Sequence, residues 1–294
     1  MGRLREALKN KNLVIVVGAG VTLSATSDTA GNPLQRLTWT GLIRNGLDYL
    51  IEEGHVEPSD PRTRRAYESL EDNNPDSLLD AANIMTSQMC QNRQFATWLQ
   101  SVFGNLYGEV RHPAILEVLK ALREEGATLL TTNYDDLLEK KCNLQHIGRS
   151  DRDKILKFKR RAIDGVFHVH GSYHDPDEVV LDTTGYYKVK QSDEVQNLLE
   201  TYLEYKVILF VGCGSGLEDP NFCELLKWAS VRQENIPNQH FLLVRDEDSL
   251  NHKMLLRLKY GPEYRDLAPY LRRLLDISAP TATVSRLPNG ESCE

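Results

Sequence analysis

The chain has 294 residues and a formal net charge of -7 at pH 7, with 40% apolar and 26% charged residues. No apolar run approaches the ~20 residues that a membrane span needs, and the acidic balance argues against broad binding to nucleic acid or to a membrane surface. We therefore expect a soluble protein. Its five scattered cysteines predict reduced thiols in a cytoplasmic, intracellular compartment and leave no four-cysteine zinc site.

The N-terminal part predicts the first strand and turn of a parallel sheet. Residues 12–17 form a β-branched run that meets Gly18-Ala19-Gly20. Glycines at such a junction let a phosphate approach backbone N–H groups. The third glycine of the dinucleotide-binding fingerprint is replaced by Leu23, and Thr22 offers a hydroxyl at the same loop. Tight packing of the turn is the alternative explanation for the glycines.

A long helical region follows before the next strand. Residues 37–107 keep apolar side chains at helical spacing and contain few strand signals. We expect this region to be a helical insertion packed beside the sheet.

Two later strands end in polar residues. Residues 127–130 run into Thr132, Asn133 and Asp135, for which capping of the next helix is an alternative role, most seriously for Asp135. Residues 165–172 contain His168 and His170, which we expect on one face of a strand.

The second histidine of that strand is a candidate general base. An unperturbed imidazole pKa of about 6.5 is easily poised near neutral pH, and His170 stands directly before Gly171. A hydrogen-bonded core histidine is the alternative. We assign His168 a structural role.

The C-terminal half adds a second glycine-rich strand exit. Residues 206–211 are the most strand-like segment and run into Gly212, Gly214 and Ser215, and residues 240–244 predict another buried strand. Residues 279–294 lack periodicity and are expected to be a disordered tail or linker.

These five strand candidates alternate with helices and predict an α/β fold. We expect a Rossmann-like parallel sheet flanked by helices, formed by residues 1–278, with the helical insertion at about 37–107 and no zinc-binding module. Because the carboxyl ends of parallel strands share one edge, both glycine loops, Asn133 and His170 should meet at one crevice.

The four motifs, in this order, resemble those of the sirtuin (silent information regulator) family. Gly18-Ala-Gly20-x-Thr22 is similar to its glycine loop, Thr132-Asn133-x-Asp135 to its Gln-Asn-x-Asp segment, His170-Gly171 to its His-Gly, and Gly212-Cys-Gly214-Ser215 to its Gly-Thr-Ser segment. The Gly-Ile-Pro-Asp-Phe-Arg-like segment and the four-cysteine zinc module of the deacylases have no counterpart. The chain is more similar to sirtuin-like NAD hydrolases of the immune-effector type.

The resemblance implies a reaction and its residues. NAD would be the substrate, cleaved to nicotinamide and ADP-ribose without a metal, with Asn133 positioning water or a ribose hydroxyl and His170 acting as base. The residues that would contact NAD are Gly18, Ala19, Gly20, Thr22, Thr132, Asp135, Gly212, Gly214 and Ser215.

The resemblance also implies a biological setting. The chain would be an NAD-depleting immune or cell-death effector of the anti-phage kind, active as a homo-oligomer or filament, with further domains of a longer receptor left open. An NAD-dependent protein deacylase or ADP-ribosyl transferase is one alternative. A noncatalytic NAD- or ADP-ribose-binding assembly module is the other.

Overall fold

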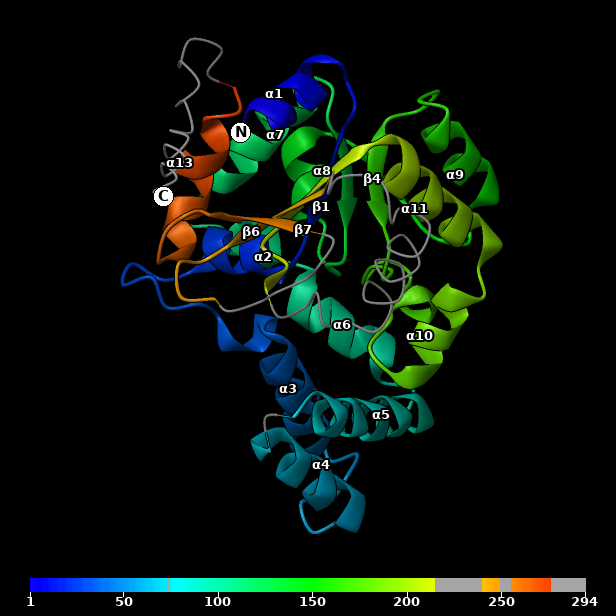
Figure 1. The fold of residues 1–294 in the computed structure, drawn as a ribbon. Helices are drawn as coiled ribbons and strands as arrows, with labels where there is room; N and C mark the ends of the chain where they lie inside the picture. The colour runs from blue at the N-terminus through cyan, green and yellow to red at the C-terminus, as the bar shows by residue number, and fades with distance from the viewer. Residues whose placement is uncertain (73, 215–239, 249–254, 276–294) are drawn as a thin grey trace, which may run out of the picture.

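The computed structural model describes residues 1–72, 74–214, 240–248 and 255–275. Within them, seven parallel strands form one sheet in the order β3-β4-β2-β1-β5-β6-β7 (Figure 1). The predicted Rossmann-like α/β fold is therefore confirmed. The strands are β1 (Leu13–Val17), β2 (Thr128–Thr131), β3 (Gln145–Ile147), β4 (Gly165–His168), β5 (Val207–Val211), β6 (His240–Val244) and β7 (Leu255–Lys259).

Helices cover both faces of this sheet (Figure 1). All five residues of β1 are buried, and they alternate between two apolar clusters, one on each face, as a strand covered on both sides requires. The first cluster is closed by α1 (Gly2–Lys9), α2 (Ala19–Thr26), α7 (Ala114–Glu124), α8 (Leu137–Cys142) and α13 (Leu267–Arg272). The second is closed by α9 (Arg152–Lys159), α10 (Thr183–Lys190) and α11 (Asp193–Tyr205).

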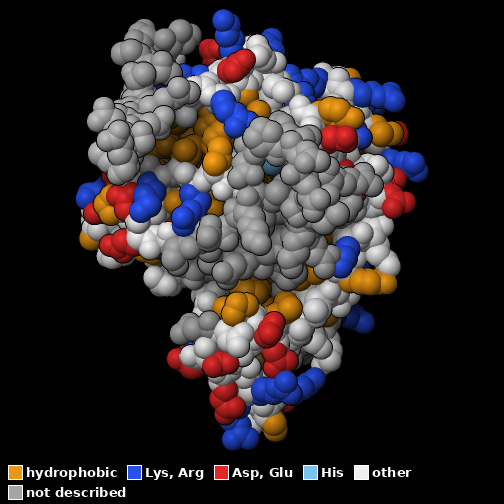
Figure 2. All heavy atoms as spheres, viewed as in Figure 1, with side chains coloured by type: hydrophobic (Ala, Val, Ile, Leu, Met, Phe, Trp, Pro, Cys, Tyr) orange, Lys and Arg blue, Asp and Glu red, His pale blue; other side chains and the backbone are white. Residues whose placement is uncertain are grey.

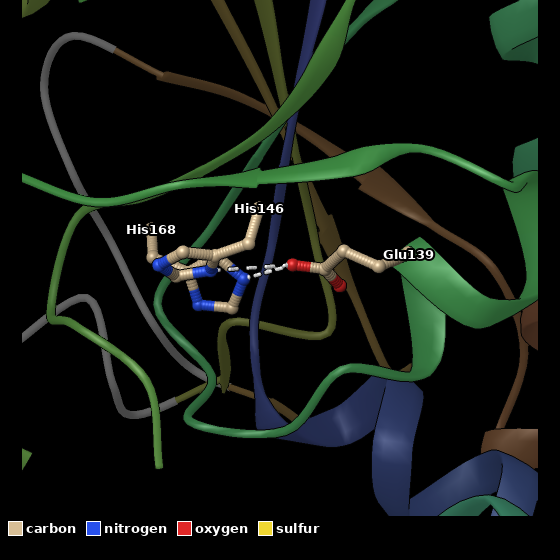
Figure 3. Close-up of side chains that lie close together, drawn as sticks. All are labelled: Glu139, His146 and His168. Carbon is tan, nitrogen blue, oxygen red and sulfur yellow. Dashed lines mark hydrogen bonds and ion pairs between the residues drawn. The ribbon is translucent and has the colours of Figure 1, made fainter. Parts of the chain in front are cut away.

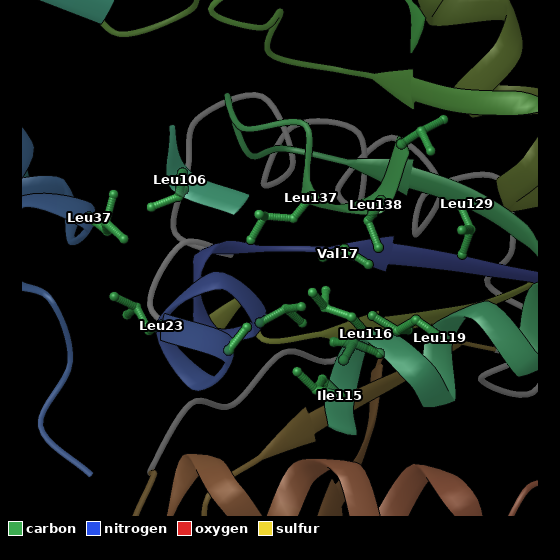
Figure 4. Close-up of a cluster of buried hydrophobic side chains, with 14 of the residues drawn as sticks. Val17, Leu23, Leu37, Leu106, Ile115, Leu116, Leu119, Leu129, Leu137 and Leu138 are labelled. Carbon is green, nitrogen blue, oxygen red and sulfur yellow. The ribbon is translucent and has the colours of Figure 1, made fainter. Parts of the chain in front are cut away.

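The first cluster fixes α2 and α8, the two helices that follow strands β1 and β2. Figure 4 shows Val17 of β1 and Leu129 of β2 among Leu23, Leu137 and leucines of α7. All of these side chains are at most 6% exposed. Burial of a leucine or valine contributes roughly 1.5–3 kcal/mol, so the loops between these strands and helices start and end on firmly packed elements.

The region between α2 and α7 is helical, as the sequence predicts. Its α-helices are α3 (Trp39–Glu52), α4 (Pro61–Glu71), α5 (Pro75–Gln91) and α6 (Phe95–Phe103), with short 3-10 turns η1 (Gln35–Leu37) and η2 (Leu106–Glu109). Trp98 is fully buried here, and its Nε1 donates to Asn45 Oδ1 at 2.9 Å. Helices α3, α4 and α5 project away from the sheet at the bottom of Figure 1.

The surface of this projecting part carries charges of both signs. Figure 2 shows acidic and basic side chains interspersed at the bottom of the molecule. Exposed ion pairs join Arg44 to Glu71 at 2.6 Å and Arg65 to Asp80 at 2.9 Å. Such pairs contribute little to stability, so apolar contacts hold these helices together. Among the described residues, no helix has the length and apolar character that crossing a bilayer requires.

The register of the central strands brings their carboxyl ends to one edge. Val17 at the end of β1 lies beside Thr131 of β2 and Val211 of β5, and Thr131 lies beside His168 of β4. The residues that follow these four positions therefore start from adjacent points on the sheet. The expected convergence of the four strand tips is present.

Candidate functional site

A chain of two hydrogen bonds links the tips of β1 and β2. Asn133 Nδ2 donates to Thr22 Oγ1 at 2.9 Å, and Thr22 Oγ1 donates to Asp135 Oδ2 at 2.7 Å. All three side chains are buried. Because an ionised carboxylate can only accept, the Thr22 hydroxyl must donate to it and accept from Asn133. The side-chain nitrogen of Asn133 is thus held by the protein, which leaves its side-chain oxygen, Oδ1, to accept a hydrogen bond from another group.

Asp135 also caps the start of helix α8, which was the alternative role predicted for it. Its Oδ1 accepts from the backbone nitrogen of Leu137, the first residue of α8, at 3.1 Å. Burial raises the pKa of this carboxyl to about 6, although the hydrogen bonds from Thr22 and from the Leu137 backbone act to lower it. Above that pH the carboxylate is ionised, and it orients both the helix and, through Thr22, the Asn133 amide.

The backbone of Thr132 and Asn133 is fixed at the start of the same loop. Thr132 N donates to Val17 O at 3.0 Å, and Asn133 N donates to Thr131 Oγ1 at 3.0 Å. Thr132 is half-buried. The tip of β2 is consequently a rigid platform for Asn133.

The two glycine loops pack directly against one another. Gly18 N donates to Val211 O at 2.9 Å, and Gly20 N donates to Gly212 O at 2.8 Å. A Cβ at Gly18 would lie 2.8 Å from the Cα of Cys213, and one at Gly20 would lie 2.9 Å from the Cα of Gly212. These glycines are required by close approach of the two backbones, which is the alternative role that the sequence left open.

The sequence predicted that these N–H groups bind a phosphate, but they have other acceptors. In the structure the N–H groups of Gly18 and Gly20 already donate to the neighbouring loop. Ala19, between them, is exposed and begins α2. The N-terminal end of that helix reaches the surface here, where the helix dipole favours an anion.

The glycine-rich segment after β5 has a backbone conformation that residues with a side chain rarely adopt. Gly212 has φ +68° and Gly214 has φ +42°, a region that glycine enters without steric cost. Both are half-buried beside the first loop. Ser215, the last residue assigned to this loop, lies outside the described residues.

His170 lies just past the end of β4, beside the tip of β2. Val169 N donates to Thr131 O at 2.9 Å, and the His170 carbonyl accepts from Val180 N at 2.9 Å. The next residue, Gly171, has φ +74°, and a Cβ there would lie 2.3 Å from the carbonyl oxygen of Glu178. The chain can turn beneath segment 178–180 only with glycine at this position.

His168 and His170 have different surroundings, although the sequence predicted that they lie on the same face of a strand. The His170 ring is 4% exposed and meets the ring of Tyr186, from α10, edge-on with centroids 6.0 Å apart. His168 is fully buried and faces Glu139 of α8. The alternation of a strand stops because β4 ends at His168.

Several polar contacts around this site were not foreseen from the sequence. The Tyr134 hydroxyl donates to Val180 O at 2.6 Å, so it ties the β2 tip to the segment that covers His170. Asp182 caps α10 by accepting from Gly185 N at 2.8 Å, and so positions Tyr186. An Asp three residues before a glycine at a helix start could have indicated the cap. No local signal could have paired the tyrosine with a carbonyl 46 positions away.

Comparison with known proteins agrees with this arrangement. Residues 127–264 match the family model described as "SIR2-like domain". A Bacillus subtilis protein named "Defense-associated sirtuin 2" is 24% identical over 178 residues, which covers 54% of this chain and 17% of the relative. The chain thus corresponds to a small part of that relative's length. The matched segment runs from β2 through Asn133 and His170 to beyond β5, so this part of the chain is similar to a SIR2-like domain.

Proposed function

We propose that the chain is an NAD hydrolase that cleaves the bond between nicotinamide and ribose. The observation that carries the proposal is the Thr22–Asp135 chain of hydrogen bonds, which fixes the Asn133 amide so that its oxygen is offered to a ligand. A hydrogen-bond acceptor held in this way can orient a water molecule or a ribose hydroxyl. His170, on the adjacent strand tip, supplies a base.

The reaction needs few groups from the protein. The bond between the ribose anomeric carbon and the nicotinamide nitrogen breaks, and its electron pair leaves with nicotinamide. Water adds to the anomeric carbon, and His170 accepts a proton from that water or from a ribose hydroxyl. The products are nicotinamide, ADP-ribose and a proton. The exposed N-terminal end of α2 would hold the pyrophosphate, and the two glycine loops beside it would pack against the adenosine half.

The relative's name supports a defence role for this activity. It is called a defence-associated sirtuin, so we further propose that this chain depletes NAD as a defence effector. We also propose that it works as a homo-oligomer, as the resemblance in sequence implies. Size-exclusion chromatography with light scattering checks assembly. A monomer at every concentration, with and without NAD, would count against it.

The deciding experiment is incubation of purified protein with NAD, with chromatography of nicotinamide and ADP-ribose. We expect both products without any peptide acceptor, and a loss of about 100-fold or more in His170→Ala and in Asn133→Ala. His112→Gln is the matched control, since His112 is an exposed histidine at the start of the α7 region. Circular dichroism must show that all variants keep the fold.

The other outcomes separate the remaining functions. Products that form only with an acyl-lysine peptide would make the chain a deacylase. Binding of NAD by calorimetry without turnover would leave a noncatalytic binding module. Full activity in either alanine variant would remove that residue from the mechanism.

A further inference from the structure

Three side chains from three different elements meet behind the Asn133 tip. Glu139 comes from α8, His146 from β3 and His168 from β4, and Figure 3 shows both imidazoles facing the Glu139 carboxylate. His168 Nε2 is hydrogen-bonded to Glu139 Oε1, and His146 Nδ1 lies 3.6 Å from the same oxygen. One nitrogen of each ring and one carboxylate oxygen all lie within 4.8 Å of one another.

The opposite nitrogen of each imidazole faces an acceptor. His168 Nδ1 lies 3.1 Å from Asn133 O and 3.3 Å from Gly171 O, so it must carry a proton. His146 Nε2 lies 3.3 Å from Asp175 Oδ2. Metal-binding histidines are commonly held this way, with the outer N–H directed at a carbonyl or a carboxylate and the inner lone pair directed at the ion.

The cluster is buried and its polar groups are incompletely satisfied. Glu139 is 9% exposed and His168 is fully buried, while the His146 side chain is 21% exposed. Within the described part of the chain, Glu139 Oε2 and both ring nitrogens of His146 are buried without a well-aligned hydrogen bond. A buried polar atom without a partner is costly, and a cation bound by His146 Nδ1 would remove that cost for this nitrogen.

The ligand types favour one class of ion. Two imidazole nitrogens and one carboxylate oxygen suit Zn²⁺ and related divalent transition metals, whereas Ca²⁺ and Mg²⁺ prefer oxygen alone. Ligand atoms about 2.0–2.2 Å from zinc in a tetrahedron lie a little over 3 Å apart. The present 3.6 Å between Glu139 Oε1 and His146 Nδ1 is close to that spacing.

We propose that Glu139, His146 and His168 bind a divalent transition-metal ion of the zinc class, which joins α8, β3 and β4 beneath the site. Because His168 also contacts the backbone carbonyls of Asn133 and Gly171, the ion would help to fix the ends of strands β2 and β4. The ion has no part in the proposed cleavage of NAD. Metal binding by these three residues therefore does not depend on that activity.

The competing explanation is a buried ion pair without a metal. Burial acts against both charges, but the charge of His168 holds the pKa of Glu139 below its ordinary value, and Glu139 raises the pKa of His168. Such a pair would join α8 to β4 by itself. It would leave His146 Nδ1 without a well-aligned hydrogen bond and would not respond to zinc.

The test is zinc binding to the full chain after treatment with a chelator. Calorimetry and metal analysis should show an equimolar amount of bound Zn²⁺, and Co²⁺ in its place should give visible absorption from a tetrahedral site. His146→Gln is the primary variant because this half-buried residue is the ligand whose replacement disturbs the core least. We expect its zinc affinity to fall at least about 10-fold, with circular dichroism unchanged.

Two matched controls exclude binding elsewhere. His174→Gln removes a neighbouring exposed histidine whose Nε2 faces Asp136, and Cys90→Ser removes an exposed thiol. Both should bind zinc as the wild type does. If His146→Gln failed to fold, the rise of the wild-type melting temperature with Zn²⁺ and the Co²⁺ spectrum would decide. Equal zinc binding by His146→Gln, or no stoichiometric binding by the wild type, would overturn the proposal.

Discussion

Replacing Thr22 with valine separates its hydroxyl from its shape. The hydroxyl accepts from Asn133 and donates to Asp135, both of which are buried. Valine would leave the amide nitrogen and the carboxylate oxygen without these partners. Each unsatisfied buried group costs about 1–3 kcal/mol, so Thr22→Val should lower the free energy of unfolding by about 2–6 kcal/mol.

Thr22→Ser is the matched control, since it keeps the hydroxyl. It removes one buried methyl group and should cost about 1 kcal/mol. Urea unfolding followed by circular dichroism measures both variants. Under conditions in which both are folded, NAD cleavage should fall about 100-fold in Thr22→Val, because the Asn133 amide is no longer oriented, and should stay within a few-fold of the wild type in Thr22→Ser.

The two measurements test different statements. If Thr22→Val and Thr22→Ser are equally stable, the two hydrogen bonds of Thr22 do not hold the tips of β1 and β2 together. If Thr22→Val is less stable but cleaves NAD as fast as Thr22→Ser, the two hydrogen bonds are structural and do not orient Asn133 for the reaction.

Two further substitutions and one pH dependence test the site's construction. Gly20→Ala should destabilise the protein by at least 1 kcal/mol, because its Cβ would overlap backbone after β5, whereas Ala19→Ser at an exposed position should change stability little in the same urea assay. The pKa of Asp135 rises from its ordinary 3.8 to about 6 in the fold, so ionisation of this carboxyl lowers the stability of the wild type as the pH rises. The stability of Asp135→Asn relative to the wild type should therefore increase by about 2 kcal/mol between pH 4 and pH 7, and a constant difference would refute the shift. Tyr134→Phe removes one hydrogen bond to Val180 and should cost about 1 kcal/mol in unfolding free energy; a cost near zero would mean that water replaces it.

The sequence predicted the central strands because they are buried on both faces. A strand such as β1 must then be apolar at every position, and an uninterrupted run such as residues 13–17 is visible without any structure. The edge strands β3 and β7 were missed because they are not buried on both faces. β3 has only three residues and includes Gln145 and His146, and most of β7 is exposed or half-buried, so neither gives a continuous apolar run.

The sequence by itself determined which polar residues follow the buried strands, and therefore that Asn133, His170 and both glycine loops meet at one edge of a parallel sheet. Only the tertiary structure decided what each of them contacts. Thr22 and Asn133 are 111 positions apart, and the N–H groups of Gly18 and Gly20 reach Val211 and Gly212 across a still longer stretch of sequence. Hydrogen bonds across such separations depend on register and helix placement, which cooperative packing of the whole core sets and which no local pattern encodes.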